Sequence, residues 1–296
     1  MKVHLDCIPC YVNQAVEASG FAAMDEDERW EAVQEVCREL SEVDRMKPSA
    51  QVGQKVHKIV RDHAESGDPY HEQKKSSNEK ANEFFDEFRE EVENSSDPLN
   101  TAARLAAAGN IVDFGPQRDF DVERTLREGL TEEFAINHWE EFSQHLKGAE
   151  NILYFADNSG EIVFDKLFIE VLLRETGVEE LDLVVKDGPF LNDVTVEDAL
   201  KLNMDEIDGV KIRKVDNGDD GESPTLWSDE VEGWIDDFDL TISKGQANYE
   251  GLSGYSKRSL FFLLVVKCPL VEEEVGAEVG KKVLVNAHRR GHDQSR

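Results

Sequence analysis

The sequence predicts an α/β protein with a three-layer α/β/α architecture, a mostly parallel sheet and an additional N-terminal helical domain. In the first part of the chain, apolar residues recur at helical spacing, and breakers such as Pro48 and Pro69 separate the stretches. From about residue 149, short apolar runs alternate with helical stretches, the pattern of strands joined by crossover helices. We therefore expect an N-terminal helical domain over 1–145, an α/β domain over 146–287 and a polar tail over 288–296.

Several segments of the first part have the apolar stripe of an amphipathic helix, for example Val33, Val36 and Leu40. The last of them is rich in alanine and ends at Gly109-Asn110, where we expect a left-handed C-cap. The expected helices cover residues 31–40, 52–63, 78–92 and 100–108.

The second part contains apolar runs of strand length, separated by helical stretches and turns. The stretch 161–174 has the apolar spacing of a helix, and Thr195 with Asp198 predicts a capping box that opens another one. The expected strands cover residues 152–156, 181–185, 210–215, 240–243, 261–266 and 283–285.

The charge of the chain restricts its partners. With 64 acidic and 33 basic residues the formal net charge is −31, which repels nucleic acid and anionic membranes. Acidic residues occur along the whole chain, which favours the hypothesis of a protein from a salt-rich, halophilic cytoplasm. No apolar run approaches the roughly 18 residues of a membrane span. The first residues lack an apolar signal region, so we expect a cytoplasmic protein.

The four cysteines are Cys7, Cys10, Cys37 and Cys268, too few for a disulfide scaffold. Cys7 and Cys10 form a CxxC motif, for which half a zinc site, a redox pair and two ordinary thiols on one helix face are all open interpretations. Of these, two reduced and partly buried thiols are favoured.

Three polar clusters follow expected strands, where ligands bind in open α/β sheets. They cover residues 157–161, 188–193 and 244–248. The carboxylates and amide carbonyls of these clusters are hard oxygen ligands that would suit Mg²⁺ or Mn²⁺. Lys244 is suited to phosphate oxygens, and Gly245 lets the backbone approach a ligand closely.

Each cluster also has an ordinary structural interpretation. Residues 157–160 suit a strand-to-helix turn with an N-cap, Asn192-Asp193 could be a cap, and Lys244-Gly245 could be a surface turn. The coincidence of three such clusters at strand ends favours a functional site.

In this order and spacing, these and other motifs resemble the damage-control phosphatases, metal-dependent enzymes first described as a domain of unknown function. The resemblance covers nearly the whole chain and is to the prokaryotic branch with an N-terminal CxxC. The motifs occupy residues 5–10, 68–70 with Lys74 or Lys75 and Asn78, 109–115, 157–161 with Asp165, 191–195 and 244–250.

The resemblance implies that Asp157, Asn158 and Asp193 hold a catalytic divalent metal ion, which could be Mg²⁺, Mn²⁺, Co²⁺ or Ni²⁺. It also implies that Lys267 binds phosphate; in the eukaryotic branch an Arg-Thr pair precedes this lysine, whereas Val266 precedes it here, which implies a different substrate range. The loop implied to contact substrate consists of Lys244, Gly245, Gln246, Ala247 and Asn248.

The implied reaction is hydrolysis of a phosphate monoester of a small metabolite, such as a sugar phosphate, with Asp157, Lys244 and Lys267 as catalytic residues. Asp157 could be a nucleophile or only a metal ligand. Glu161 is expected to orient water or a sugar hydroxyl, or to cap a helix, and Asn110 and Asp113 to reach the site as a lid.

Two alternatives belong to other functional classes. Relatives of this fold have been proposed to methylate carboxylates with S-adenosylmethionine, although no Gly-x-Gly-x-Gly loop follows the first expected strand here. The other alternative is a non-enzymatic zinc or redox module that uses Cys7 and Cys10.

Overall fold

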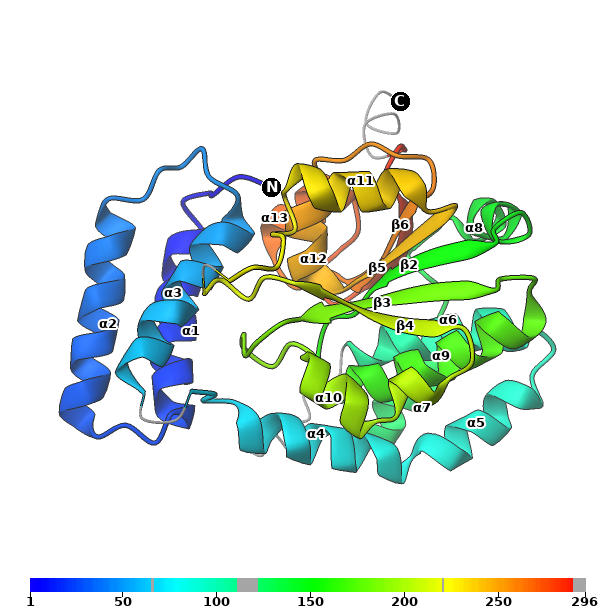
Figure 1. The fold of residues 1–296 in the computed structure, drawn as a ribbon, viewed down its shortest axis with the longest axis horizontal. Helices are drawn as coiled ribbons and strands as arrows, with labels where there is room; N and C mark the ends of the chain where they lie inside the picture. Colours follow the sequence, from blue (N-terminus) through cyan, green and yellow to red (C-terminus); the bar gives the residue numbers. More distant parts are fainter. Residues whose placement is uncertain (65–66, 111–121, 220, 290–296) are drawn as a thin grey trace.

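The computed structural model describes residues 1–64, 67–110, 122–219 and 221–289. It confirms the predicted fold class: helices cover both faces of a mostly parallel seven-stranded sheet (Figure 1). In the described residues, no helix is long and apolar enough to cross a bilayer.

The sheet has the strand order β1-β7-β6-β5-β2-β3-β4. All neighbouring strands are parallel except β6 and β7, which are antiparallel. Six of the strands match the expected ones; β1 was not predicted, since two residues form no recognisable pattern. The strands are β1 (Ile136–Asn137), β2 (Asn151–Phe155), β3 (Glu180–Lys186), β4 (Val210–Val215), β5 (Leu240–Lys244), β6 (Leu260–Val265) and β7 (Lys282–Asn286).

Successive side chains of each strand point to opposite faces of the sheet, so the strands contribute to two hydrophobic cores. In β2, Ile152 and Tyr154 belong to the core on one face, whereas Leu153 and Phe155 belong to the core on the other. The first face is covered by α5 (Phe85–Glu93), α6 (Pro98–Gly109), α7 (Val122–Thr131), α8 (Trp139–Leu146), α9 (Glu161–Glu175) and α10 (Val196–Lys201), with η1 (Met204–Glu206). The second face is covered by α11 (Asp229–Asp237), α12 (Gly245–Leu252) and α13 (Pro269–Val275).

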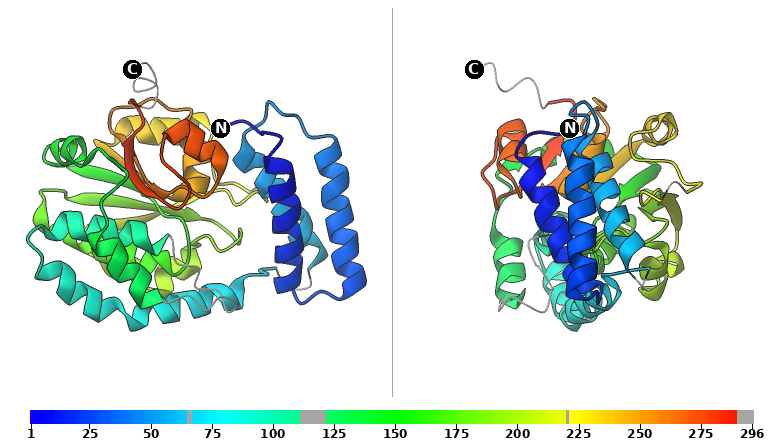
Figure 2. Two further views of the ribbon diagram at one scale, coloured as in Figure 1. Left: turned by 180° about the vertical axis from the view of Figure 1, so that it is seen from behind. Right: turned by 90° about the vertical axis from the view of Figure 1, so that its left-hand side faces the viewer.

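The first three helices form a separate bundle, seen at the left of Figure 1 and from two further sides in Figure 2. They are α1 (Cys7–Phe21), α2 (Glu26–Ser41) and α3 (Ser49–His63), and residues such as Val36, Val56 and Val60 form their own small core. From the bundle, α4 (His71–Glu83) runs along the lower edge of the molecule in Figure 1 towards α5.

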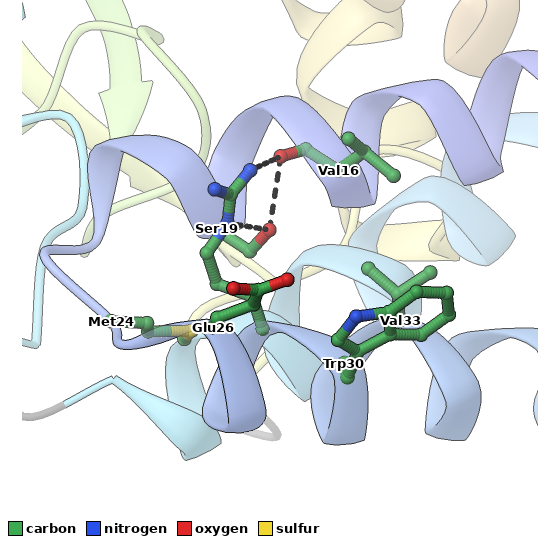
Figure 3. Close-up of a pocket in the computed structure, with 7 residues that line it drawn as sticks. Val16, Ser19, Met24, Glu26, Trp30 and Val33 are labelled. Carbon is green, nitrogen blue, oxygen red and sulfur yellow. Dashed lines mark hydrogen bonds between the residues drawn. The ribbon is translucent and has the colours of Figure 1, made fainter.

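Between α1 and α2 the bundle has a mostly apolar depression of about 430 Å³, lined among others by Val16, Met24 and Trp30 (Figure 3). Arg29 also lines it and donates hydrogen bonds to Ser19 Oγ and the Val16 carbonyl.

The helices of the first part do not all lie in the bundle. Helix α6 packs on α9, and the pair Ile136–Asn137 extends the sheet beside β7. The division into domains near residue 145 stays a prediction.

Two local expectations were wrong. The stretch 78–92 is not one helix, because α4 ends at Glu83 and α5 begins at Phe85. The expected left-handed C-cap of α6 is absent: Asn110 has φ −74°, a right-handed conformation, and its N–H donates to the Ala107 and Ala108 carbonyls. The turn thus continues the sense of the helix, which directs the Asn110 side chain towards the polar residues that follow β2.

Candidate active site

The polar clusters converge at the point where the connections of the sheet change direction. Strands β2 and β5 are neighbours, but the chain continues from β2 to β3 on one side and from β5 to β6 on the other. Such a switch point leaves a crevice at the carboxyl ends of the strands. The residues that follow β2, β5 and β3 therefore meet at one edge of the sheet.

Asp157 lies in the middle of this site. It is buried, and its Oδ2 accepts hydrogen bonds from Nδ2 of Asn110 at 2.9 Å and Nδ2 of Asn158 at 2.6 Å. Nδ2 of Asn110 also donates to Oε2 of Glu161, at 2.6 Å. Asn110 thus reaches the site from α6, as expected, and holds two carboxylates together; Asp113 lies outside the described residues.

Asp193 comes from the loop after β3. This loop is joined to the loop after β2 by backbone hydrogen bonds from Val194 N to Asp157 O at 2.9 Å and from Ser159 N to Asn192 O at 2.8 Å. Nζ of Lys186, at the end of β3, lies 3.8 Å from Oδ2 of Asp193. The two loops therefore form one unit that places both aspartates beside a lysine.

Burial, together with the negative charges of Glu161 and Asp193, raises the pKa of Asp157 to about 8, against the opposing effects of Lys267 and Asn110. Burial also raises the pKa of Asp193 to about 6, against the opposing effect of Lys186. A cation placed between these carboxylates would favour their ionised forms.

Lys244 lies at the end of β5 and is fully buried. Its Nζ lies 2.5 Å from Oε1 of Glu161 and 3.1 Å from the carbonyl oxygen of Ala106, and it also pairs with Asp165. Burial by itself disfavours the ammonium, but the charges of Asp165 and Glu161 outweigh it and raise the pKa of Lys244. The structure thus places Lys244 under the site, with three partners inside the protein.

A cavity of about 260 Å³ lies in front of Asp157, between the bundle and the carboxyl edge of the sheet. Of the predicted site residues, those that line it are Asp157, Asn158, Asp193, Gln246, Ala247 and Lys267. The other walls come from α1, α3, β3 and nearby loops, and include Tyr11, Gln14, Gln54, Lys186, Phe190 and Leu226.

Two predicted residues, Asn248 behind the cavity and Gln246 in its wall, tie the surrounding elements together. Nδ2 of Asn248 donates to the carbonyls of Ala156 at 2.8 Å and Lys244 at 2.9 Å, so it ties the ends of β2 and β5 together. Oε1 of Gln246 accepts from the backbone N–H of Lys267 at 2.8 Å, which joins α12 to the end of β6.

Sequence reasoning missed the contribution of the bundle and of Lys186. Tyr11, Gln14 and Gln54 have no signal in the sequence, because they contact the cavity only through the docking of α1 and α3. Lys186 follows a predicted strand directly, and its position at the carboxyl edge was the one signal that could have indicated it.

The donor set fits a hard divalent cation. Asp157, Asn158 and Asp193 line one cavity, and their side chains offer two carboxylates and one amide, which are oxygen ligands of the kind that such cations prefer. Among the described residues, the buried Oδ1 of Asn110 and Oγ of Ser159 have no hydrogen-bond partner, which leaves polar atoms beside the carboxylates for a ligand or water.

The described residues contain no group of three or more His, Cys, Asp or Glu side chains arranged to hold a metal ion. The predicted set is consistent with this, because it has two carboxylates and one amide. Of the CxxC cysteines, Cys7 is buried and Cys10 exposed, and both are free thiols.

The fold and the site define an α/β protein with an acidic, lysine-flanked cavity at the switch point of its sheet. The chain belongs to the family described as the damage-control phosphatase ARMT1-like domain, which matches residues 3–283.

Relatives match along nearly their whole length. A damage-control phosphatase of Archaeoglobus fulgidus is 32% identical, with 96% of this chain and 98% of the relative covered. A damage-control phosphatase of Pyrococcus horikoshii is 31% identical, with 96% of this chain and 97% of the relative covered. The crystal structure of a DUF89 family protein from Pyrococcus horikoshii superimposes with a TM-score of 0.86 at 29% identity, covering 97% of this chain and 99% of that one.

Proposed function

We propose that this protein is a divalent-metal-dependent phosphatase that hydrolyses phosphate monoesters of small metabolites, such as sugar phosphates or damaged phosphometabolites, in the cytoplasm. The observation that supports this most directly is one cavity lined by two buried aspartates and two lysines, Asp157 and Asp193 with Lys186 and Lys267. The relatives named damage-control phosphatases support the same reaction.

Asp157, Asn158 and Asp193 would hold the metal ion, which could be Mg²⁺, Mn²⁺, Co²⁺ or Ni²⁺. When bound, such an ion polarises a phosphoryl oxygen and activates or orients the attacking group. Asn110 holds the carboxylates of Asp157 and Glu161 in fixed positions by donating to both.

Lys267 and Lys186 would neutralise the phosphate charge. Both line the cavity, and Lys267 is the more exposed of the two. In a chain with a net charge of −31, cations at this place provide local attraction for an anion that the rest of the surface repels. The same net charge argues against nucleic acid and anionic membranes as partners.

The small cavity favours a small substrate. Its volume of about 260 Å³ is bounded by the bundle, with Tyr11 and Gln54 opposite the loops of the sheet. Substrate bound there would be partly shielded from water, which strengthens its electrostatic interactions with the lysines.

The test is phosphate release from a panel of phosphometabolites and a chromogenic phosphate ester, in molar KCl, with each of the four metal ions. The wild-type protein is compared with Asp193→Asn and with the exposed surface variant Asp208→Asn as a matched control. Metal-dependent release that is lost only in Asp193→Asn supports the proposal. No release by folded wild-type protein with any metal would reject it and favour the methyltransferase or thiol-module hypotheses.

A further inference from the structure

Helix α4 is linked to both loops that carry the predicted metal ligands, directly to the loop after β2 and through α10 to the loop after β3. The first contact is Asn78, whose Oδ1 accepts a hydrogen bond of 2.6 Å from the backbone N–H of Gly160. Gly160 has φ +83° and connects the Asp157-Asn158 pair to the first residue of α9, Glu161. Because no side chain caps α9 from its own N-cap, Asn78 supplies from outside an acceptor that holds this turn.

The second contact is Lys74, which is buried. Its Nζ lies 2.9 Å from Oδ2 of Asp198 and 3.1 Å from Oδ2 of Asp68. Oδ2 of Asp198 accepts in turn from the N–H of Thr195 at 3.0 Å and its hydroxyl at 2.6 Å. Thr195 is two residues after Asp193, so Lys74 holds the second loop through the N-terminus of α10.

The structure also distinguishes two neighbouring lysines of the motif. Lys74 is buried with two acidic partners, whereas Lys75 is exposed and lines a different cavity, of about 450 Å³, between α4, α9 and α10. Lys74 is therefore the lysine with a role at the active-site loops.

Helix α4 is anchored at its other end. Tyr70, the residue before the helix, is buried in the core of the bundle and packs against Phe21 with ring centroids 5.2 Å apart. Helix α4, which leaves the bundle along the lower edge of Figure 1, thus connects the bundle to both loops, and the bundle and the loops line the same cavity.

We propose that α4 is a positioning element for the metal site, in which Asn78 sets the turn that carries Asp157 and Asn158 and Lys74 sets the loop that carries Asp193. This inference rests on the proposed function. The ligands come from separate loops, so their mutual geometry depends on what each loop is fastened to. Partners that hold metal ligands in place typically contribute about 10–100-fold in metal affinity or activity.

The test compares Asn78→Leu, which removes the acceptor, with Asn78→Asp, which keeps an acceptor oxygen. Asn82→Leu is the matched control, because Asn82 is one helical turn further along α4 and lines the same 450 Å³ cavity as Asn78. Mn²⁺ binding is measured by calorimetry without substrate, and phosphate release is measured over a range of Mn²⁺ concentrations. Thermal unfolding of the metal-free proteins reports the fold separately.

For Asn78→Leu we expect the Kd for Mn²⁺ and the half-maximal Mn²⁺ concentration to rise about 10–100-fold, with a lower kcat and a KM within about threefold of wild type. For Asn78→Asp we expect a Kd for Mn²⁺ within a few-fold of the wild-type value. For Asn82→Leu we expect the wild-type Kd and activity. If Asn78→Leu does not fold, Asn78→Ala, which adds no bulk, has the same expected result.

Wild-type affinity for Mn²⁺ in folded Asn78→Leu or Asn78→Ala would overturn the inference and leave the phosphatase proposal standing. Failure of the folded wild-type protein to release phosphate with Mg²⁺, Mn²⁺, Co²⁺ or Ni²⁺ would instead reject the proposed function. The two failures are therefore distinguishable.

Discussion

A Cβ atom on Gly245 would lie only 1.8 Å from Oδ2 of Asp157. Gly245 also has φ +72°, a left-handed conformation that other residues rarely adopt. The backbone after β5 therefore packs directly against the central carboxylate, and both the space and the conformation require glycine at this position.

We expect Gly245→Ala to displace the Asp157 carboxylate and to reduce kcat/KM by about 100-fold, because a misplacement of about 1 Å has costs of that order. Phosphate release at saturating metal measures the effect. The control is Gly233→Ala in α11, where an added Cβ meets no atom within 4 Å. If Gly245→Ala retained the wild-type kcat/KM, the close packing of Gly245 against Asp157 would not be required for catalysis.

Lys244→Met should destabilise the protein by about 3–5 kcal/mol, because it leaves the buried carboxylates of Glu161 and Asp165 without their cation. Denaturant unfolding at constant pH measures the loss. Adding Glu161→Gln and Asp165→Asn to this variant should recover part of it. Unchanged stability with a raised KM would mean instead that Lys244 mainly contacts phosphate.

Lys267→Gln should lower kcat/KM for a phosphate ester by about 100-fold, because it removes a positive charge from the cavity. Binding of Mn²⁺ should not weaken, since Lys267 repels a metal ion bound at Asp157. Steady-state kinetics and calorimetry measure the two effects, with Lys211→Gln, an exposed lysine paired with Glu180, as the control. A loss of Mn²⁺ affinity in Lys267→Gln would contradict this role.

The stability of the protein should depend on pH through His57. Burial lowers the pKa of His57 to about 3, and its Nε2 lies 3.1 Å from Oε1 of Gln14. The unfolded chain, with an ordinary histidine pKa of about 6.5, therefore binds a proton at a pH where the folded protein does not. This contribution to stability is complete above pH 6.5 and decreases as the pH falls towards 3.

At pH 4.5 the loss amounts to about 2–3 kcal/mol relative to pH 8. Subtracting the denaturation free energies of His57→Gln from those of wild type at each pH removes the contributions of the carboxyl groups. The same pH dependence in both proteins would show that His57 is not responsible.

Stability should also increase with KCl concentration. At a net charge of −31, self-repulsion destabilises the folded state, and salt screens it. Thermal unfolding in dilute buffer and in molar KCl measures the change. Equal stability in both would contradict the hypothesis of adaptation to a salt-rich cytoplasm.

Much of the sheet was predictable, because its strands are short apolar runs that the local sequence specifies. The expected helix at Thr195 is confirmed, and Thr195 and Asp198 form the predicted capping box. Parallel strands bring their carboxyl ends to one edge, so Asp157, Asp193 and Gly245 could be expected near one another. The α/β pattern came from local apolar periodicity, and the family resemblance came from the order and spacing of motifs along the chain.

Other features depend on contacts between distant segments. The antiparallel pairing of β6 with β7, the docking of the bundle against the cavity and the link from Asn78 to Gly160 join residues far apart in the chain. No periodicity encodes such contacts, since they arise only when the layers have packed.

By itself, the sequence determined the fold class, the strand ends that carry the polar clusters and the family. Only the tertiary structure decided that Lys244 is paired with Glu161 and Asp165 inside the protein while Lys267 lines the cavity. Two lysines that both follow strands look alike in sequence. Their environments differ because α9 passes over the end of β5 with two carboxylates, and the low dielectric of the interior makes that pairing strong.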